Sequence, residues 1–259
     1  MSKHHWNYVR QGQGAPLLLL HGMGSYWGAW RHVVPLLAGC RDVIAVDLPG
    51  YGDSAPPPSD MAATPEGFAR MLCGLLDDLG LDRVEVAGNS IGGWTALELA
   101  RLGRASRVTL LSPAGLWRKG VPLYCLVSLV LTRLLAGLTA PLAPAVAASP
   151  LGRSLLLWQA VGQPGRMTVA DTVGAVRGMA GASGFWRNLK DSLRLRFQEW
   201  GAVGVPVRIG WGDRERLILP SARGAGDLPP HVVISVLPGC GHVPMYDDPQ
   251  AVADLILSE

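Results

Sequence analysis

Residues 86–93 read Val86-Ala87-Gly88-Asn89-Ser90-Ile91-Gly92-Gly93, and this stretch of the 259-residue chain decides the fold. A short apolar run, 83–86, precedes the turn and an Ala/Leu-rich segment, 94–102, follows it, which predicts a strand, a tight turn and a helix. Gly88 and Gly92 flank Ser90 at the G-x-S-x-G spacing of a nucleophile elbow, whose strained turn holds the serine hydroxyl clear of the backbone. With 33 glycines in the chain, a purely structural turn is the alternative, and the surrounding sequence has to decide.

Composition restricts the class of protein. Hydrophobic residues make up 49% of the chain and charged residues 17%, which is typical of a globular domain with a sizeable core. A net charge of +3 without a Lys/Arg block argues against nucleic-acid binding. The four cysteines lack C-x-x-C spacing, so neither a disulfide framework nor a metal site is indicated, and no cofactor is expected. The first residues contain no apolar signal region, which predicts a cytoplasmic protein.

Strand and helix patterns alternate along most of the chain. Strands are expected at 17–20, 43–46, 83–86, 108–111, 205–211 and 232–237, after a possible early strand within 4–10. Helices are expected at 64–79, 94–102 and 249–257, and 25–37 is expected to be a loop that passes into a helix. Strands separated by helices require crossover connections. The sequence therefore predicts an α/β fold with a mostly parallel, twisted sheet flanked by helices.

The alternation stops between 116 and 200, where only helical apolar stretches occur. We therefore expect a core formed by 1–115 and 201–259, with 116–200 inserted as a helical cap, or lid. The run 121–138 is strongly apolar, but Arg133 interrupts it and prolines follow it. Because a transmembrane helix needs about 20 apolar residues, the pattern favours an apolar cap over a membrane span.

Four motifs occur in a characteristic order. They are His21-Gly22-Met23-Gly24, Asp47-Leu48-Pro49-Gly50-Tyr51-Gly52-Asp53-Ser54, Gly88-Asn89-Ser90-Ile91-Gly92-Gly93 and Gly239-Cys240-Gly241-His242-Val243-Pro244. With these motifs the chain resembles the α/β-hydrolase superfamily over nearly all of its length. The resemblance implies that fold with an inserted helical cap, in the serine-nucleophile branch that includes esterases and carbon–carbon bond hydrolases. Since one plausible strand precedes residue 17, the sheet is expected to be one strand short of the family's usual eight.

The resemblance also implies a catalytic triad. Ser90 would be the nucleophile and His242 its base, because a serine hydroxyl is protonated at neutral pH and needs a base that a third group orients. The family places the acid in a W-G-x-x-D pattern, and this chain reads Trp211-Gly212-Asp213-Arg214-Glu215. The matching position is therefore Glu215, with Asp213 as the alternative acid.

Other roles follow from the same motifs. The backbone N–H groups of Met23 and Ile91 would form the oxyanion hole, and His21 would be structural. Trp27, just past the oxyanion loop, and Asn89, next to the nucleophile, are expected to bind substrate. Together with the apolar cap, Trp27 suggests a hydrophobic acyl or aromatic group beside the scissile bond.

The resemblance leaves several functions open. The first is a hydrolase of an ester or lactone, acting on a small hydrophobic substrate. The second is a carbon–carbon bond hydrolase of the meta-cleavage type, which shares Asn89 but usually has a tryptophan where this chain has Val243, and a cap arginine for the substrate carboxylate. The third is a ligand-binding protein on a hydrolase scaffold. Dehalogenases and epoxide hydrolases of this superfamily use an aspartate nucleophile, so Ser90 argues against both. The oligomeric state is not indicated.

Overall fold

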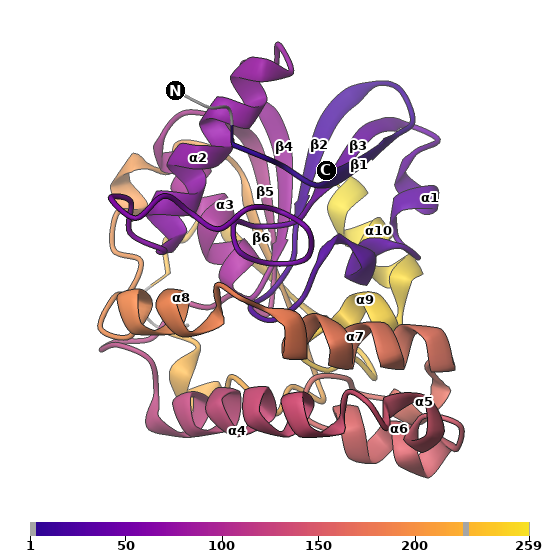
Figure 1. Ribbon diagram of the computed structural model, residues 1–259. Coiled ribbons are helices and arrows are strands. Elements are labelled where there is room, and N and C mark those ends of the chain that lie inside the picture. Colours follow the sequence, from indigo (N-terminus) through magenta and orange to yellow (C-terminus); the bar gives the residue numbers. More distant parts are fainter. Residues whose placement is uncertain (1–3, 225–227, 259) are drawn as a thin grey trace.

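A seven-stranded sheet forms the centre of the computed structural model, which describes residues 4–224 and 228–258 (Figure 1). The sheet order is β1-β3-β2-β4-β5-β6-β7, with β1 Tyr8–Gln11, β2 Ala15–Leu20, β3 Arg41–Val46, β4 Val84–Asn89, β5 Ala105–Leu111, β6 Val207–Gly212 and β7 Val232–Leu237. Strand β1 runs antiparallel to β3, and the other neighbouring strands are parallel. The predicted fold class is confirmed, and within the described ranges the sheet has one strand fewer than eight.

Both faces of the sheet are covered by helices, which explains why its central strands are continuous apolar runs. On β2, Leu18 and Leu20 belong to the core beneath α2 Pro65–Asp78 and α3 Ile91–Arg101. Leu17 and Leu19 point to the other face, where α1 Val34–Leu37 and α10 Pro249–Leu257 pack. Alternate side chains of one strand therefore stabilise two separate apolar layers.

Local capping sets where the long core helices begin. The Thr64 hydroxyl accepts a hydrogen bond from the Gly67 N–H at 3.1 Å, and Pro65 occupies the first turn of α2. Asp248 caps α10 in the same way, accepting from the Ala251 N–H at 2.9 Å. The first N–H groups of a helix have no acceptor within it. A side-chain oxygen at the cap accepts from one of them, and a proline in the first turn has no N–H to leave unpaired.

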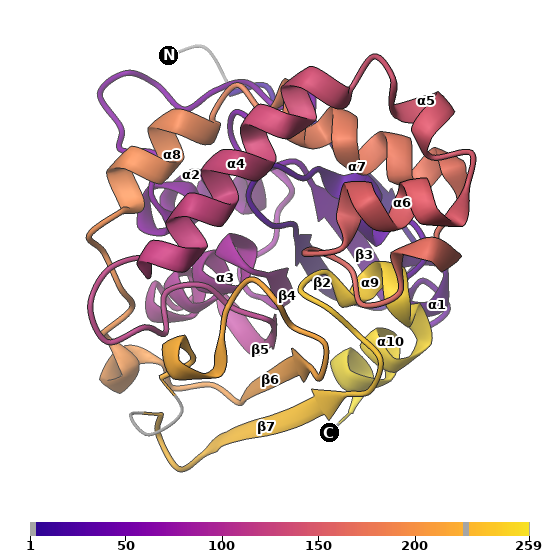
Figure 2. The same cartoon turned by 90° about the horizontal axis from the view of Figure 1, so that it is seen from below.

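Helices also connect β5 to β6. They are α4 Leu123–Thr139, α5 Ala143–Val146, α6 Pro150–Leu157, α7 Val169–Gly181 and α8 Phe185–Ser192. Figures 1 and 2 show α4 to α7 stacked over one end of the sheet, and we call α4 to α8 the cap helices. They lie inside the range 116–200; the exact limits of a cap domain stay a prediction.

Helix α4 is apolar on more than one side. Only Cys125 and Ala136 of its residues are buried, although most of its side chains are apolar. Among the described residues, no helix has the length and apolar character to cross a membrane. The apolar run that resembles a membrane segment in the sequence is instead a helix lying across the end of the sheet.

Candidate active site

Ser90 stands at the corner between β4 and α3 with φ 54° and ψ −117°, a backbone conformation that residues other than glycine rarely adopt. A Cβ atom at Gly88 would overlap the Gly92 carbonyl oxygen, and one at Gly92 would overlap the Leu20 carbonyl oxygen. The Ser90 N–H donates to the Leu111 carbonyl at 2.9 Å and fixes the turn to β5. The two glycines therefore permit the close packing that places Ser90 at the end of the sheet.

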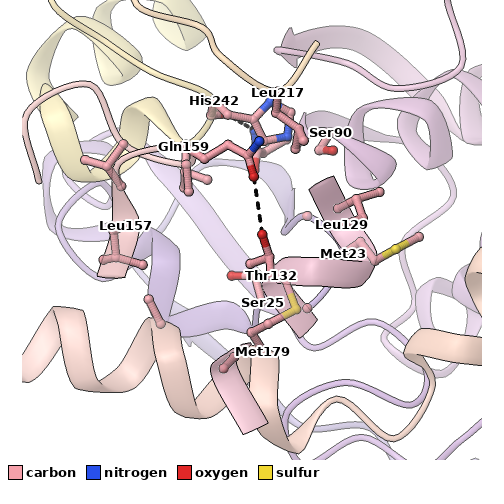
Figure 3. Close-up of a pocket in the computed structure, with 18 of the residues that line it drawn as sticks. Met23, Ser25, Ser90, Leu129, Thr132, Leu157, Gln159, Met179, Leu217 and His242 are labelled. Carbon is pink, nitrogen blue, oxygen red and sulfur yellow. Dashed lines mark hydrogen bonds between the residues drawn. The ribbon is translucent and has the colours of Figure 1, made fainter. Parts of the chain in front are cut away.

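His242, in the loop after β7, is paired with Glu215, in the loop after β6. The Nδ1 atom of His242 lies 2.7 Å from Oε2 of Glu215, and both residues are buried. The other carboxylate oxygen, Oε1, accepts from the N–H groups of Leu217 at 2.7 Å and Ile218 at 3.0 Å. Ser90 and His242 line the same cavity, and Figure 3 shows them close together on its wall. This arrangement leaves the Nε2 side of the imidazole for the nucleophile.

Asp213 takes no part in this pair. Its side chain is exposed, and its Oδ1 atom accepts from the Gly239 N–H at 2.7 Å. Of the two candidate acids, the structure brings Glu215 to the imidazole and Asp213 to the turn after β7.

The environment keeps Glu215 ionised. Burial by itself would raise the pKa of this carboxyl, but the charge of His242 and the hydrogen bonds from His242, Ile218 and Leu217 outweigh it and lower the pKa from 4.5 to about 2. A permanent carboxylate at this position can hold the imidazole with its proton on Nδ1 and stabilise an imidazolium.

This lowered pKa predicts how stability depends on pH. Because the folded pKa lies below the unfolded one, ionised Glu215 stabilises the fold above about pH 4.5, and this contribution is lost as the pH falls towards about 2. We expect wild type to exceed Glu215→Gln in free energy of unfolding by roughly 3 kcal/mol near neutral pH, with the gap closing in acid. Urea unfolding of both proteins at several pH values measures the gap. A gap independent of pH would contradict the ionic role of Glu215.

The loop after β2 lies next to Ser90 on the cavity wall. Residues 22–25 form a turn closed by the Ser25 N–H, which donates to the Gly22 carbonyl at 3.1 Å, with Gly24 at φ 73°. The turn does not use the N–H of Met23, and the N–H of Ile91, first in α3, has no acceptor within its helix. Met23 and Ile91 both line the cavity beside Ser90.

His21 ties this loop to the loop after β3. Its Nε2 atom accepts from the Leu48 N–H at 2.9 Å, so its Nδ1–H donates to the Gly22 carbonyl at 2.8 Å. Burial lowers the pKa of His21, which favours the neutral imidazole that this bonding requires. The side chain is structural, as the sequence indicates.

The two residues expected to bind substrate have different positions. Asn89 lies on the cavity wall, but its amide nitrogen donates to the carbonyls of His242 at 2.7 Å and Leu111 at 3.1 Å, so it positions the histidine loop. Trp27 is not among the residues that line the cavity, so the structure does not bring it to Ser90 there. Its N–H is bound to Asp47 at 2.6 Å at the start of a 3-10 turn, and its side chain packs on the core beneath α1 and α10.

The cavity has a volume of about 430 Å³ and is mainly apolar. Cap helices α4, α6 and α7 supply about a third of the residues that line it, and Trp94 and Trp117 also contribute. Its polar side chains outside Ser90, His242 and Asn89 are those of Ser25, Thr132, Thr139, Gln159, Ser192 and Tyr246. Among the described residues, no lysine or arginine lines it.

The sequence did not reveal three polar residues near the site. The Thr132 hydroxyl donates to Oε1 of Gln159 at 3.2 Å, drawn as a dashed line in Figure 3, and links α4 to the end of α6 inside the cavity. Asp247 accepts from the N–H groups of Gly162 and Gly241, each at 2.8 Å, and joins the histidine loop to the cap. Which residues of a cap helix face the cavity depends on tertiary packing, so the sequence could not place Thr132 and Gln159 there. Asp247 belongs to no recognised motif.

Comparisons with known proteins agree with this geometry. A family model described as the alpha/beta hydrolase family matches residues 17–255. The epoxide hydrolase EphH of Mycobacterium tuberculosis is 32% identical over 197 residues, 71% of this chain and 88% of that protein. The 2-hydroxymuconate semialdehyde hydrolase of Pseudomonas sp. strain CF600 is 38% identical over 114 residues, 42% of this chain and 40% of that protein.

Solved structures show the same fold. An esterase from Thermogutta terrifontis matches with a TM-score of 0.76 at 22% identity, over 98% of this chain and 92% of that one. The chain belongs to the alpha/beta hydrolase family and is a hydrolase of that fold.

Proposed function

We propose that the protein is a serine hydrolase of esters or lactones that carry a hydrophobic acyl or aromatic group. The observation that supports this most is the buried pair of His242 and Glu215, 2.7 Å apart, on the same cavity as a serine held at positive φ. This is the arrangement of nucleophile, base and orienting acid that acyl transfer requires.

The reaction follows from these positions. Ser90 Oγ attacks the carbonyl carbon while Nε2 of His242 takes its proton, and Glu215 stabilises the resulting imidazolium. The N–H groups of Met23 and Ile91 donate to the carbonyl oxygen as it becomes negative, at no cost of reorganisation. The imidazolium then protonates the departing alkoxide, leaving an acyl-enzyme on Ser90. Water, deprotonated by His242, attacks this ester, releases the acid and restores the serine.

The serine at the nucleophile position argues against epoxide hydrolysis, the activity for which EphH is named. A carboxylate that opens an epoxide forms an ester, which water cleaves at the acyl carbon. Ser90 would form an ether, which the His242 base cannot hydrolyse. The residue at the elbow therefore favours acyl chemistry.

Carbon–carbon bond hydrolysis is the second candidate, supported by the similarity to the Pseudomonas hydrolase over 114 residues. Its ring-fission substrates carry a carboxylate, for which related enzymes use a cap arginine. The cap arginines Arg153, Arg166, Arg177 and Arg187 do not line the cavity. An uncharged apolar wall suits an ester better than a dicarbonyl acid.

A series of p-nitrophenyl esters from acetate to decanoate tests the proposal. We expect kcat/KM to rise at least about tenfold from acetate to a medium chain, because each buried methylene contributes about 0.8 kcal/mol. A ring-fission vinylogous diketone is expected to show no turnover. Preference for acetate, or faster turnover of the diketone, would contradict the proposed substrate class.

A further inference from the structure

The cap presents an apolar face to the outside. Along α4 the side chains of Leu123, Val127, Leu131, Leu134 and Leu138 repeat at helical spacing and are between 47% (Val127) and 75% (Leu138) exposed. On and just after α6, Leu151, Leu155 and Trp158 are 53–70% exposed. Figure 2 looks onto α4 and α6, which lie in front of the sheet. We call these eight side chains the cap apolar face.

This face is continuous with the cavity. Leu155 and Trp158 are exposed to the outside and also line the cavity that holds Ser90, and Leu135 of α4, 57% exposed, does the same. Exposed apolar groups of this number on a monomer mark an interaction site. Here that site adjoins the cavity that holds Ser90.

The charged residues of the chain segment that forms α4 and α6 have one sign. Between residues 99 and 170 the sequence contains no aspartate or glutamate, while the part from 116 onwards carries Arg118, Lys119, Arg133, Arg153 and Arg166. A segment that combines exposed apolar groups with basic residues and has no acidic ones has the composition of a surface that binds anionic lipids.

A shallow recess with three arginines borders the same face. Arg166, Arg214 and Arg216 line it together with Trp158. The Arg216 guanidinium donates to the Trp158 carbonyl, and the Tyr124 hydroxyl of α4 donates to the Arg216 carbonyl at 2.9 Å, so this arginine lies between α4 and α6. Within the part of the chain that the structure describes, none of the three arginines forms an ion pair with a carboxylate. Arg166 and Arg216 can therefore bind an external anion, and Arg214, on which the charge of Asp247 acts, lies beside them.

We propose that the cap apolar face seats the protein on an anionic lipid surface. The leucines and Trp158 enter the boundary between headgroups and acyl chains, and Arg166, Arg214 and Arg216 bind lipid phosphates. The cavity then opens towards the acyl region, and its substrate is an ester dissolved in the lipid. The docking is inferred only from the exposed side chains of the cap, whereas the lipid-dissolved ester substrate depends on the proposed esterase function.

A second copy of the chain is the other occupant to consider. In a twofold contact the same face meets itself, so its basic groups would approach one another with no carboxylate from residues 99–170 to pair with them. This repulsion favours an anionic lipid over a partner subunit.

Flotation with vesicles tests the docking without relying on activity. Vesicles of phosphatidylcholine alone are compared with vesicles containing roughly 30% phosphatidylglycerol, where the basic groups should strengthen binding. We expect Leu131→Glu/Leu138→Glu to weaken partitioning at least about tenfold, because charges replace inserted apolar groups. Leu36→Glu, at a 39% exposed leucine on α1, is the matched control and should bind as wild type does.

A second set of variants tests the role of the arginines by the preference for anionic over neutral vesicles. Arg166→Gln/Arg214→Gln should remove most of the preference for anionic vesicles. The control Arg70→Gln, on α2, should keep this preference. About 1 M salt should weaken the preference of the wild type, because salt screens the charges. Since Leu131 and Leu138 do not line the cavity, turnover of a soluble aryl ester should be unchanged in their variant. If the wild type did not turn over the soluble aryl ester, the esterase proposal would be overturned, but the proposed lipid docking would not be affected.

Two results would overturn the docking. One is equal flotation of wild type and Leu131→Glu/Leu138→Glu. The other is a wild-type dimer in sedimentation velocity that the double variant converts to monomer, with no flotation of wild type, which would assign the face to a second copy. Equal binding to neutral and anionic vesicles would contradict the proposal that the lipid surface is anionic, because phosphatidylcholine also carries a phosphate but no net charge.

Discussion

Replacing Ser90 by alanine is expected to lower kcat for aryl esters about 10⁶-fold, because loss of the nucleophile from a triad removes the acyl-enzyme route. The turn itself should persist, since alanine meets the same backbone restriction as serine at φ 54°. Steady-state kinetics, with circular dichroism to check folding, measure the effect.

Ser112 provides a matched control for this change. It is a buried serine with φ 45°, directly after β5, and it does not line the cavity. Ser112→Ala should keep activity within a few fold of wild type. If Ser90→Ala retained more than about 1% of wild-type kcat, or if both variants lost activity equally, the hydroxyl of Ser90 would not be the nucleophile.

Glu215→Gln is expected to lower kcat about 10⁴-fold, because an amide cannot hold the imidazole in the required tautomer or stabilise its charged form. Asp213→Asn should cost less than about tenfold, since an asparagine oxygen can still accept from the Gly239 N–H. The two changes are isosteric and lie two residues apart, so each controls for the other. The reverse ranking of kcat would assign the acid to Asp213.

The core of the fold could be predicted because its signals are local. Residues 17–20 are apolar at every position, and such a run forms a strand that is buried on both faces. The glycines around Ser90 leave little choice of residue at a turn where any Cβ would overlap a carbonyl oxygen. The central strands and the position of the elbow follow from these patterns.

The cap could not be predicted in the same way. Helix α4 is apolar both where it lines the cavity, at Leu129, and where it meets the outside, at Leu131, so its periodicity does not show which side faces inward. Trp27 shows the same difficulty, because the hydrogen bond from its backbone to Asp47 turns its side chain onto the core.

The choice between two acids also needed the structure. Glu215 and Asp213 share one short loop, and a difference of one methylene does not decide which of them reaches His242. The N–H groups of Leu217 and Ile218 decide it, because they bind one oxygen of Glu215 and leave the other facing the imidazole.

Site mapping after reaction with a fluorophosphonate tests the triad most directly, because this reagent phosphonylates a serine that an adjacent base has activated. The geometry predicts one adduct per chain, on the peptide that contains Ser90, lost in Ser90→Ala and formed far more slowly in Glu215→Gln. An adduct on another serine, or an active enzyme that the reagent does not label, would contradict a nucleophile at Ser90.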